Sequence, residues 1–204
     1  MSSPAVPMSE PTAQPEPAAE TPAKAERAPL RELLPTGTFG AASVLTSAAL
    51  VGGSFARFGF SGWALLGAVL CPALVLLAAI DIRHRLLPNE IILAASLAVG
   101  LIVAASTPGD FLSHLAAGAA FFAFFVVFAV VFGAGSMGFG DAKLGFLLGL
   151  ALGPKTVGAA LIAFTAGLFA ALYVLATRGI SARKDAISYG PFLAFGGILA
   201  YFLS

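Results

Sequence analysis

The chain has 204 residues, of which 59% are hydrophobic and only 10% are charged, and its mean hydropathy is +0.96. Soluble domains usually carry about 25% charged residues, so this composition excludes an ordinary water-soluble globule and also a wholly disordered chain. Eleven Lys and Arg residues against ten Asp and Glu leave a net charge of +1, which gives no support for nucleic-acid binding.

Residues 1–36 differ in composition from the rest of the chain. They hold eight of the 13 prolines, at positions 4, 7, 11, 15, 17, 22, 29 and 35, mixed with Ala, Ser, Thr and Glu. Such a segment buries too little apolar surface to offset the entropy lost on ordering. We therefore expect a disordered tail, and the lack of a long apolar core after a basic start argues against a signal peptide.

From residue 38 onward the sequence consists of apolar runs. Their approximate limits are 39–56, 61–80, 90–106, 111–134, 142–153, 156–177 and 190–203. A helix needs roughly 20 residues to cross a bilayer core of about 30 Å. The pattern predicts an all-α, polytopic membrane domain over residues 37–204, with six to seven transmembrane helices. The fifth run is short, so it is either a re-entrant element or a helix that begins near Met137.

The distribution of basic residues favours seven spans with the N-terminus in the cytoplasm. With seven spans, nine of the eleven Lys and Arg residues lie on one side of the membrane, and only Arg57 and Lys155 lie on the other. If the fifth run did not cross, the split would be seven to four. The nine are Lys24, Arg27, Arg31, Arg83, Arg85, Lys143, Arg178, Arg183 and Lys184. By the positive-inside rule, their side is cytoplasmic.

Two aspartates stand out among the five acids that follow the tail. Asp81 directly follows the second apolar run and Asp141 directly precedes the fifth, so both are expected at the cytoplasmic end of a span. Each alone has a structural explanation, since Asp81 could belong to a solvated charge cluster and Asp141 could cap a helix. As a pair at one depth, they could share a proton and activate a water for peptide hydrolysis, without a metal or a covalent intermediate.

Three segments carry a resemblance to a known family. They are Asp81–Asn89 (DIRHRLLPN), Gly135–Leu144 (GSMGFGDAKL) and Tyr189–Ala194 (YGPFLA). In this order and at these membrane positions, they resemble the motifs of the prepilin peptidases, also called type IV leader peptidases, which are membrane aspartyl proteases of the GxGD type. The resemblance covers roughly residues 65–200.

The resemblance implies a function as well as a fold. Asp81 and Asp141 would form the catalytic dyad, and no metal or cofactor would be required. The substrate would be a type IV prepilin or pseudopilin, whose short basic leader is removed at the cytoplasmic face of the bacterial inner membrane, usually after a glycine. Longer members carry a domain with two CxxC pairs that N-methylates the pilin. Two CxxC pairs need four cysteines, and this sequence has one, Cys71. We therefore expect a peptidase without methyltransferase activity, like the short members of the family.

Further residues of these segments are expected to support the site or bind substrate: Gly138, Gly140, Lys143, Pro88, Asn89, Gly190 and Pro191. The two glycines beside Asp141 would allow backbone or an extended substrate to approach closely. Asn89 is predicted to cap the third apolar run, and Gly190 and Pro191 to start the seventh. Lys143 either holds negative charge locally or extends toward the membrane surface.

Other functions remain possible from the sequence alone. A presenilin-like GxGD protease is disfavoured because Ile80 rather than Tyr precedes Asp81, and no Pro-Ala-Leu motif follows Asp141. A small proton-coupled transporter would place its acids near the bilayer midplane and show an inverted repeat, which the sequence lacks. An assembly or scaffold protein has only the membrane location in its favour. The identity of the pilin and the oligomeric state are left open.

Overall fold

The computed structural model describes residues 29–132, 138–178 and 188–204, and the regular structure within these ranges is helical. The predicted all-α fold is confirmed. In chain order the helices are α2 (Leu30–Leu33), α3 (Gly37–Phe58), α4 (Gly62–His84), α5 (Asn89–Ser106), α6 (Phe111–Phe132), α7 (Phe139–Leu152), a 3₁₀ turn (Gly153–Lys155), α8 (Thr156–Arg178) and α9 (Gly190–Leu203).

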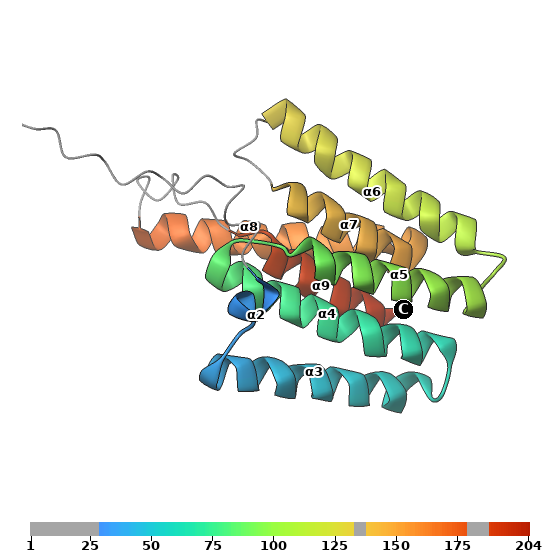
Figure 1. Ribbon diagram of the computed structural model, residues 1–204. Coiled ribbons are helices and arrows are strands. Elements are labelled where there is room, and N and C mark those ends of the chain that lie inside the picture. Colours follow the sequence, from blue (N-terminus) through green and yellow to red (C-terminus); the bar gives the residue numbers. More distant parts are fainter. Residues whose placement is uncertain (1–28, 133–137, 179–187) are drawn as a thin grey trace, which may run out of the picture.

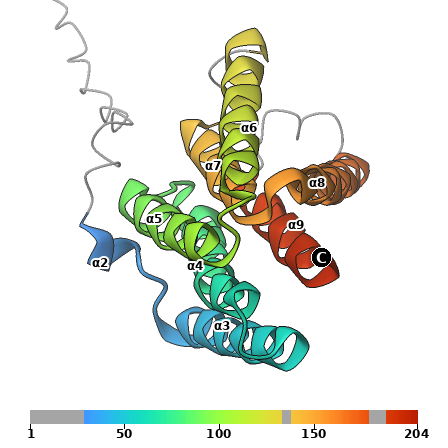
Figure 2. The same ribbon diagram turned by 90° about the vertical axis from the view of Figure 1, so that its right-hand side faces the viewer.

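The helices α3 to α9 run side by side, each in the opposite direction to the one before it (Figure 1). Helix α4 packs against α3, α5 and α9, while α7 packs mainly against α6 and α5, and α8 against α9. Viewed along the bundle, α4 and α9 lie between the outer helices (Figure 2). The C-terminal ends of α4, α6 and α8 and the N-terminal ends of α5, α7 and α9 therefore meet at one end of the bundle.

The core lies where α4, α7 and α9 face one another. Leu74, Leu148 and Leu193, one from each helix, are at most 1% exposed. Small residues permit the close contacts: a Cβ added at Gly149 of α7 would lie 2.7 Å from the backbone carbon of Ala117 in α6. Because α7 is enclosed by its neighbours, its residues from Asp141 onward are almost all buried.

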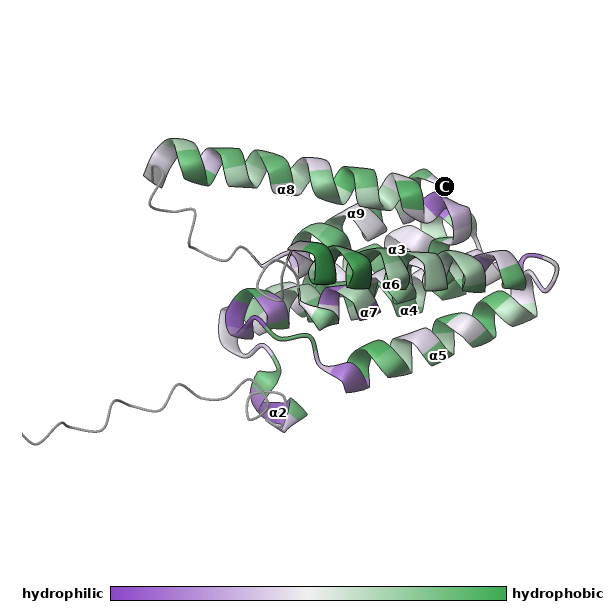
Figure 3. Cartoon of the chain, turned by 90° about the horizontal axis from the view of Figure 1, so that it is seen from above, coloured by the Kyte–Doolittle hydropathy of each residue, from purple (hydrophilic) through white to green (hydrophobic). Residues whose placement is uncertain are grey.

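The outer surface of the bundle is apolar along the lengths of the helices. Leu45, Leu101 and Val130 are each at least 70% exposed, and hydrophilic residues gather mainly near the helix ends (Figure 3). In water such a surface would be strongly unfavourable, whereas lipid chains solvate it at little cost. The chain is thus a multi-pass membrane protein.

Five stretches are long and apolar enough to cross a bilayer: Gly37–Phe58, Gly62–His84, Asn89–Ser106, Phe111–Val131 and Phe139–Thr177. The last stretch contains both α7 and α8, because the 3₁₀ turn at Gly153 reverses the chain between them. Helices α7 and α9 have 14 residues each, about 21 Å at 1.5 Å per residue, which is shorter than the bilayer core. The fifth run therefore forms a short helix that begins at Phe139, two residues after the expected start.

The first 28 residues of the predicted tail lie outside the described residues. In the rest of that segment, Leu30–Leu33 form one helical turn, and Leu33 is buried. Helix α3 then begins at Gly37.

Candidate active site

Asp81 lies in the last turn of α4 and is only 5% exposed. The C-terminal end of a helix carries partial negative charge, so a carboxylate there needs hydrogen-bond donors from elsewhere. The chain supplies them from the start of α9. The Ser188 hydroxyl donates a short hydrogen bond to Asp81 Oδ2, and the Gly190 backbone N–H also donates to this carboxylate. The guanidinium of Arg85 adds a favourable charge interaction.

Asp141 lies in the first turn of α7 and is 7% exposed. Its Oδ2 accepts a hydrogen bond of 3.1 Å from the backbone N–H of Gly138, the residue that caps the helix. The structural role considered for Asp141 therefore exists, although the carboxylate acts from the third helical position and not as the cap itself. The helix dipole and this donor both favour a negative charge at Asp141.

The two carboxylates lie at the same end of the bundle, although they are sixty residues apart in the sequence. Asp81 and Asp141 interact electrostatically across the end of the bundle where α4 finishes and α7 begins. Both are buried among apolar helices, where charges interact more strongly than in water. The structure thus places the two acids that the sequence singled out at one end of the bundle.

Gly190 allows the start of α9 to approach Asp81. A Cβ added at Gly190 would lie 3.1 Å from Asp81 Cγ and closer still to Oδ2. Pro191 follows in the first turn of α9, where its missing N–H needs no partner. Gly190 and Pro191 thus start α9 as predicted, and Gly190 is in direct contact with Asp81.

The segment between α4 and α5 is held against the start of α7. A Cβ added at Gly140 would lie 2.8 Å from Leu87 Cβ, so this glycine permits the close approach of Leu87. Nearby, the Lys143 ammonium donates a hydrogen bond of 2.5 Å to Asn89 Oδ1. These contacts tie the segment that follows Asp81 to the helix that carries Asp141.

The predicted capping role of Asn89 is wrong. Pro88 occupies the N-cap position of α5, and Asn89 is the first helical residue. The side chain of Asn89 instead accepts the hydrogen bond from Lys143. This partner is a neutral amide, so the contact supports neither of the two roles considered for Lys143 over the other. The ammonium also lies 5.8 Å from the centre of the Phe139 ring.

Ser188 is the residue that sequence reasoning missed. It stands immediately before the YGPFLA segment, and it reaches Asp81 across 107 positions in the chain. The sequence signal for this role is a polar residue close before a helix start. Serine is common at such positions because it caps helices, so the signal does not distinguish a site residue from a cap. Gly135, Ser136 and Met137 of the GxGD segment lie outside the described residues.

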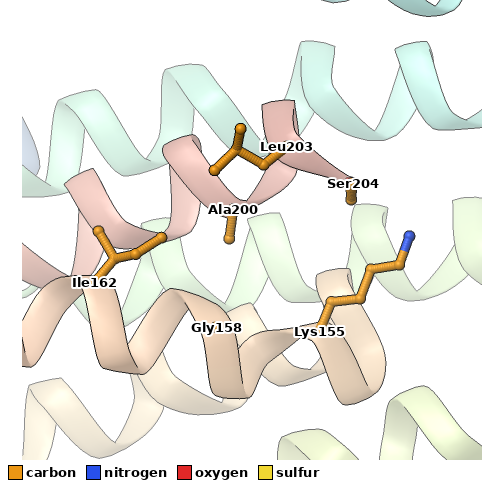
Figure 4. A pocket seen from close by; sticks show the side chains of 6 residues that line it. All are labelled: Lys155, Gly158, Ile162, Ala200, Leu203 and Ser204. Atoms are coloured by element: carbon orange, nitrogen blue, oxygen red, sulfur yellow. The ribbon is translucent and has the colours of Figure 1, made fainter.

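A different hollow lies at the opposite end of the bundle, between the start of α8 and the end of α9 (Figure 4). Its volume is about 440 Å³, and it is lined by Lys155, Gly158, Ile162, Ala200, Leu203 and Ser204. The part of α7 that follows Asp141 has 11 residues, about 17 Å at 1.5 Å per residue, and it separates this hollow from Asp141. It contains neither of the two aspartates and is distinct from the site they form.

The chain matches known proteins over most of its apolar part. A model of the type IV leader peptidase family matches residues 68–175. Among curated proteins, a prepilin leader peptidase/N-methyltransferase of Burkholderia pseudomallei is 36% identical over 167 residues, and one of Bacillus subtilis is 33% identical over 164 residues. Each alignment covers 78% of this chain, but 52% and 64% of the respective relative.

The chain thus spans between about half and two thirds of the length of these relatives. No solved structure matches it. The family model covers more than half of the chain, including both Asp81 and Asp141. The chain therefore belongs to the type IV leader peptidase family.

Proposed function

We propose that this protein is a membrane aspartyl endopeptidase that removes the short basic leader of type IV prepilins or pseudopilins. The observation that carries the proposal is that two buried carboxylates, Asp81 and Asp141, lie at one end of the helical bundle and interact electrostatically. Membership of the family gives the reaction class, and the name of the relatives gives the substrate class.

The chemistry follows from the proximity of the two acids. Two close carboxylates do not both ionise readily, so the pair holds one proton between them. The ionised member takes a proton from a water molecule, whose oxygen forms a bond to the scissile carbonyl carbon. The protonated member gives its proton to the carbonyl oxygen, and a neutral gem-diol results.

Collapse of the gem-diol breaks the C–N bond. The leaving nitrogen takes the proton that the first carboxylate received from the water. One gem-diol hydroxyl returns its proton to the second carboxylate as the new carboxylic acid forms. The dyad is thereby restored to its starting state, and the net change is the addition of one water to the peptide bond.

We place the site at the cytoplasmic face of the bacterial inner membrane. Asp81 lies at the same end of the bundle as Arg83, Arg85 and Lys143, and basic residues favour the cytoplasmic side. A basic leader that emerges on this side would reach the two acids without crossing the membrane.

The proposal covers leader removal and not N-methylation. The one cysteine of the chain, Cys71, lies fully buried in α4. A zinc site built from two CxxC pairs needs four thiolates, and this chain does not contain them.

Co-expression with a type IV prepilin tests the function. We expect the wild-type chain to remove the leader, and Asp81→Asn and Asp141→Asn to leave the precursor uncut, because Asn keeps the shape but cannot exchange a proton. Asp110→Asn is the matched control, since Asp110 is exposed in the turn before α6, at the other end of the bundle. Cleavage by either dyad variant at the wild-type rate would disprove the proposed chemistry.

A further inference from the structure

Tyr189 is held at the centre of the site by its neighbours in sequence and in space. It lies between Ser188 and Gly190, which both donate hydrogen bonds to Asp81. Its ring packs against those of Phe164 in α8 and Phe192 in α9, with centroids 5.5 Å and 6.2 Å away. These contacts leave the ring little freedom, so the hydroxyl occupies a defined position.

The hydroxyl of Tyr189 is buried, and among the described residues it has no hydrogen-bond partner. Buried polar atoms in native proteins are almost always paired, because an unpaired one loses its interactions with water without compensation. Burial also raises the pKa of Tyr189 above the ordinary value of a phenol. The group therefore keeps its proton at neutral pH and is available as a donor.

Asp141 belongs to the electrostatic surroundings of Tyr189. The two groups interact electrostatically, yet they share no direct hydrogen bond. The phenol O–H is therefore a donor that an oxygen atom of a bound substrate could accept from. During peptide hydrolysis the atom that gains negative charge next to the dyad is the carbonyl oxygen of the scissile bond.

We infer, given the peptidase function proposed above, that the Tyr189 hydroxyl is a catalytic hydrogen-bond donor to the carbonyl oxygen of the scissile peptide. It transfers no proton. It stabilises the developing charge on that oxygen while the protonated aspartate delivers its proton. The ring contacts with Phe164 and Phe192 align the donor before the substrate arrives, so little reorganisation is needed during the reaction.

Tyr189→Phe tests this role, because it removes one oxygen and keeps the aromatic packing. The assay uses the purified full chain and a purified type IV prepilin with its leader intact. We expect kcat to fall about a hundredfold, as for the loss of one oxyanion donor, while KM stays near the wild-type value. The melting temperature should not decrease, since no hydrogen bond within the described structure is lost.

Tyr201→Phe is the matched control at the opposite end of α9. The Tyr201 hydroxyl is hydrogen-bonded to Ser54 and, at 2.9 Å, to the Trp63 carbonyl. This variant should show the reverse pattern, with a lower melting temperature and an unchanged kcat. The contrast separates a structural hydroxyl from a catalytic one in the same chain.

Three results would overturn the inference about Tyr189 while leaving the peptidase function intact. They are an unchanged kcat in Tyr189→Phe, a loss of kcat that follows a loss of thermal stability, and a shifted pH dependence of kcat, which would make the residue a positioning group for Asp141. Failure of the wild-type chain to cleave the prepilin would instead refute the proposed function, and this inference with it.

Discussion

Replacing Gly190 with alanine should move the carboxylate of Asp81. The added Cβ would lie 3.1 Å from Asp81 Cγ and closer still to Oδ2, whereas ordinary van der Waals contact between such atoms begins near 3.5 Å. Either Asp81 or the start of α9 must therefore shift. Because the Gly190 N–H also donates to this carboxylate, the shift strains a hydrogen bond at the same time.

The size of the effect follows from this displacement. Relief of the overlap requires a movement of roughly 1 Å, and a misplacement of that size in a catalytic group lowers the rate about a hundredfold. A hundredfold loss corresponds to about 2.7 kcal/mol of transition-state stabilisation. We expect this loss in kcat for Gly190→Ala, with a chain that still inserts into the membrane and remains folded.

The assay is leader removal from a purified prepilin, followed by initial rates, with the melting temperature measured in parallel. Gly52→Ala is the matched control, since a Cβ at Gly52 of α3 would have no atom within 4 Å, and it should retain full activity. A Gly190→Ala variant that is as active as Gly52→Ala would refute the assigned contact between α9 and Asp81.

Two further substitutions examine the groups around the dyad. Ser188→Ala removes the hydroxyl that donates to Asp81 and should lower kcat about tenfold, the equivalent of one hydrogen bond to a charged group. Ser188→Thr should restore kcat, because threonine keeps the hydroxyl. Full activity of the alanine variant would contradict the contact. Lys143→Met breaks the hydrogen bond to Asn89. Because that bond is exposed, thermal unfolding should show a loss of about 1 kcal/mol or less, and a loss of several kcal/mol would be inconsistent with it.

Much of the fold could be predicted because membrane helices are marked by apolar runs and by the residues that end them. The last run was expected at residues 190–203, and α9 occupies Gly190–Leu203. The seven runs correspond to α3 through α9 in the described part of the chain. The start of α7 was less certain, because Phe139 and Gly140 fit a loop as well as a first helical turn.

The placement of Asp81 and Asp141 at one end of the bundle could be predicted because each lies at an end of an apolar run, and the runs alternate in direction. Their surroundings could not, because these depend on contacts between distant segments. The hydrogen bond from Ser188 spans 107 positions, and no local pattern encodes it. The wrong prediction that Asn89 caps α5 has a similar origin. Pro88 occupies the cap position, and the Asn89 side chain accepts a hydrogen bond from Lys143 of another helix.

The central claim, that Asp81 and Asp141 act as one catalytic unit, is tested most directly by a double-mutant cycle. The measurement is kcat/KM for prepilin cleavage by the full chain, in the wild type, Asp81→Asn, Asp141→Asn and the double variant. We expect each single substitution to lower kcat/KM by at least about a thousandfold, and the double variant to be no worse than either single one. Near wild-type activity in one single variant, or losses that multiply in the double variant, would contradict the claim.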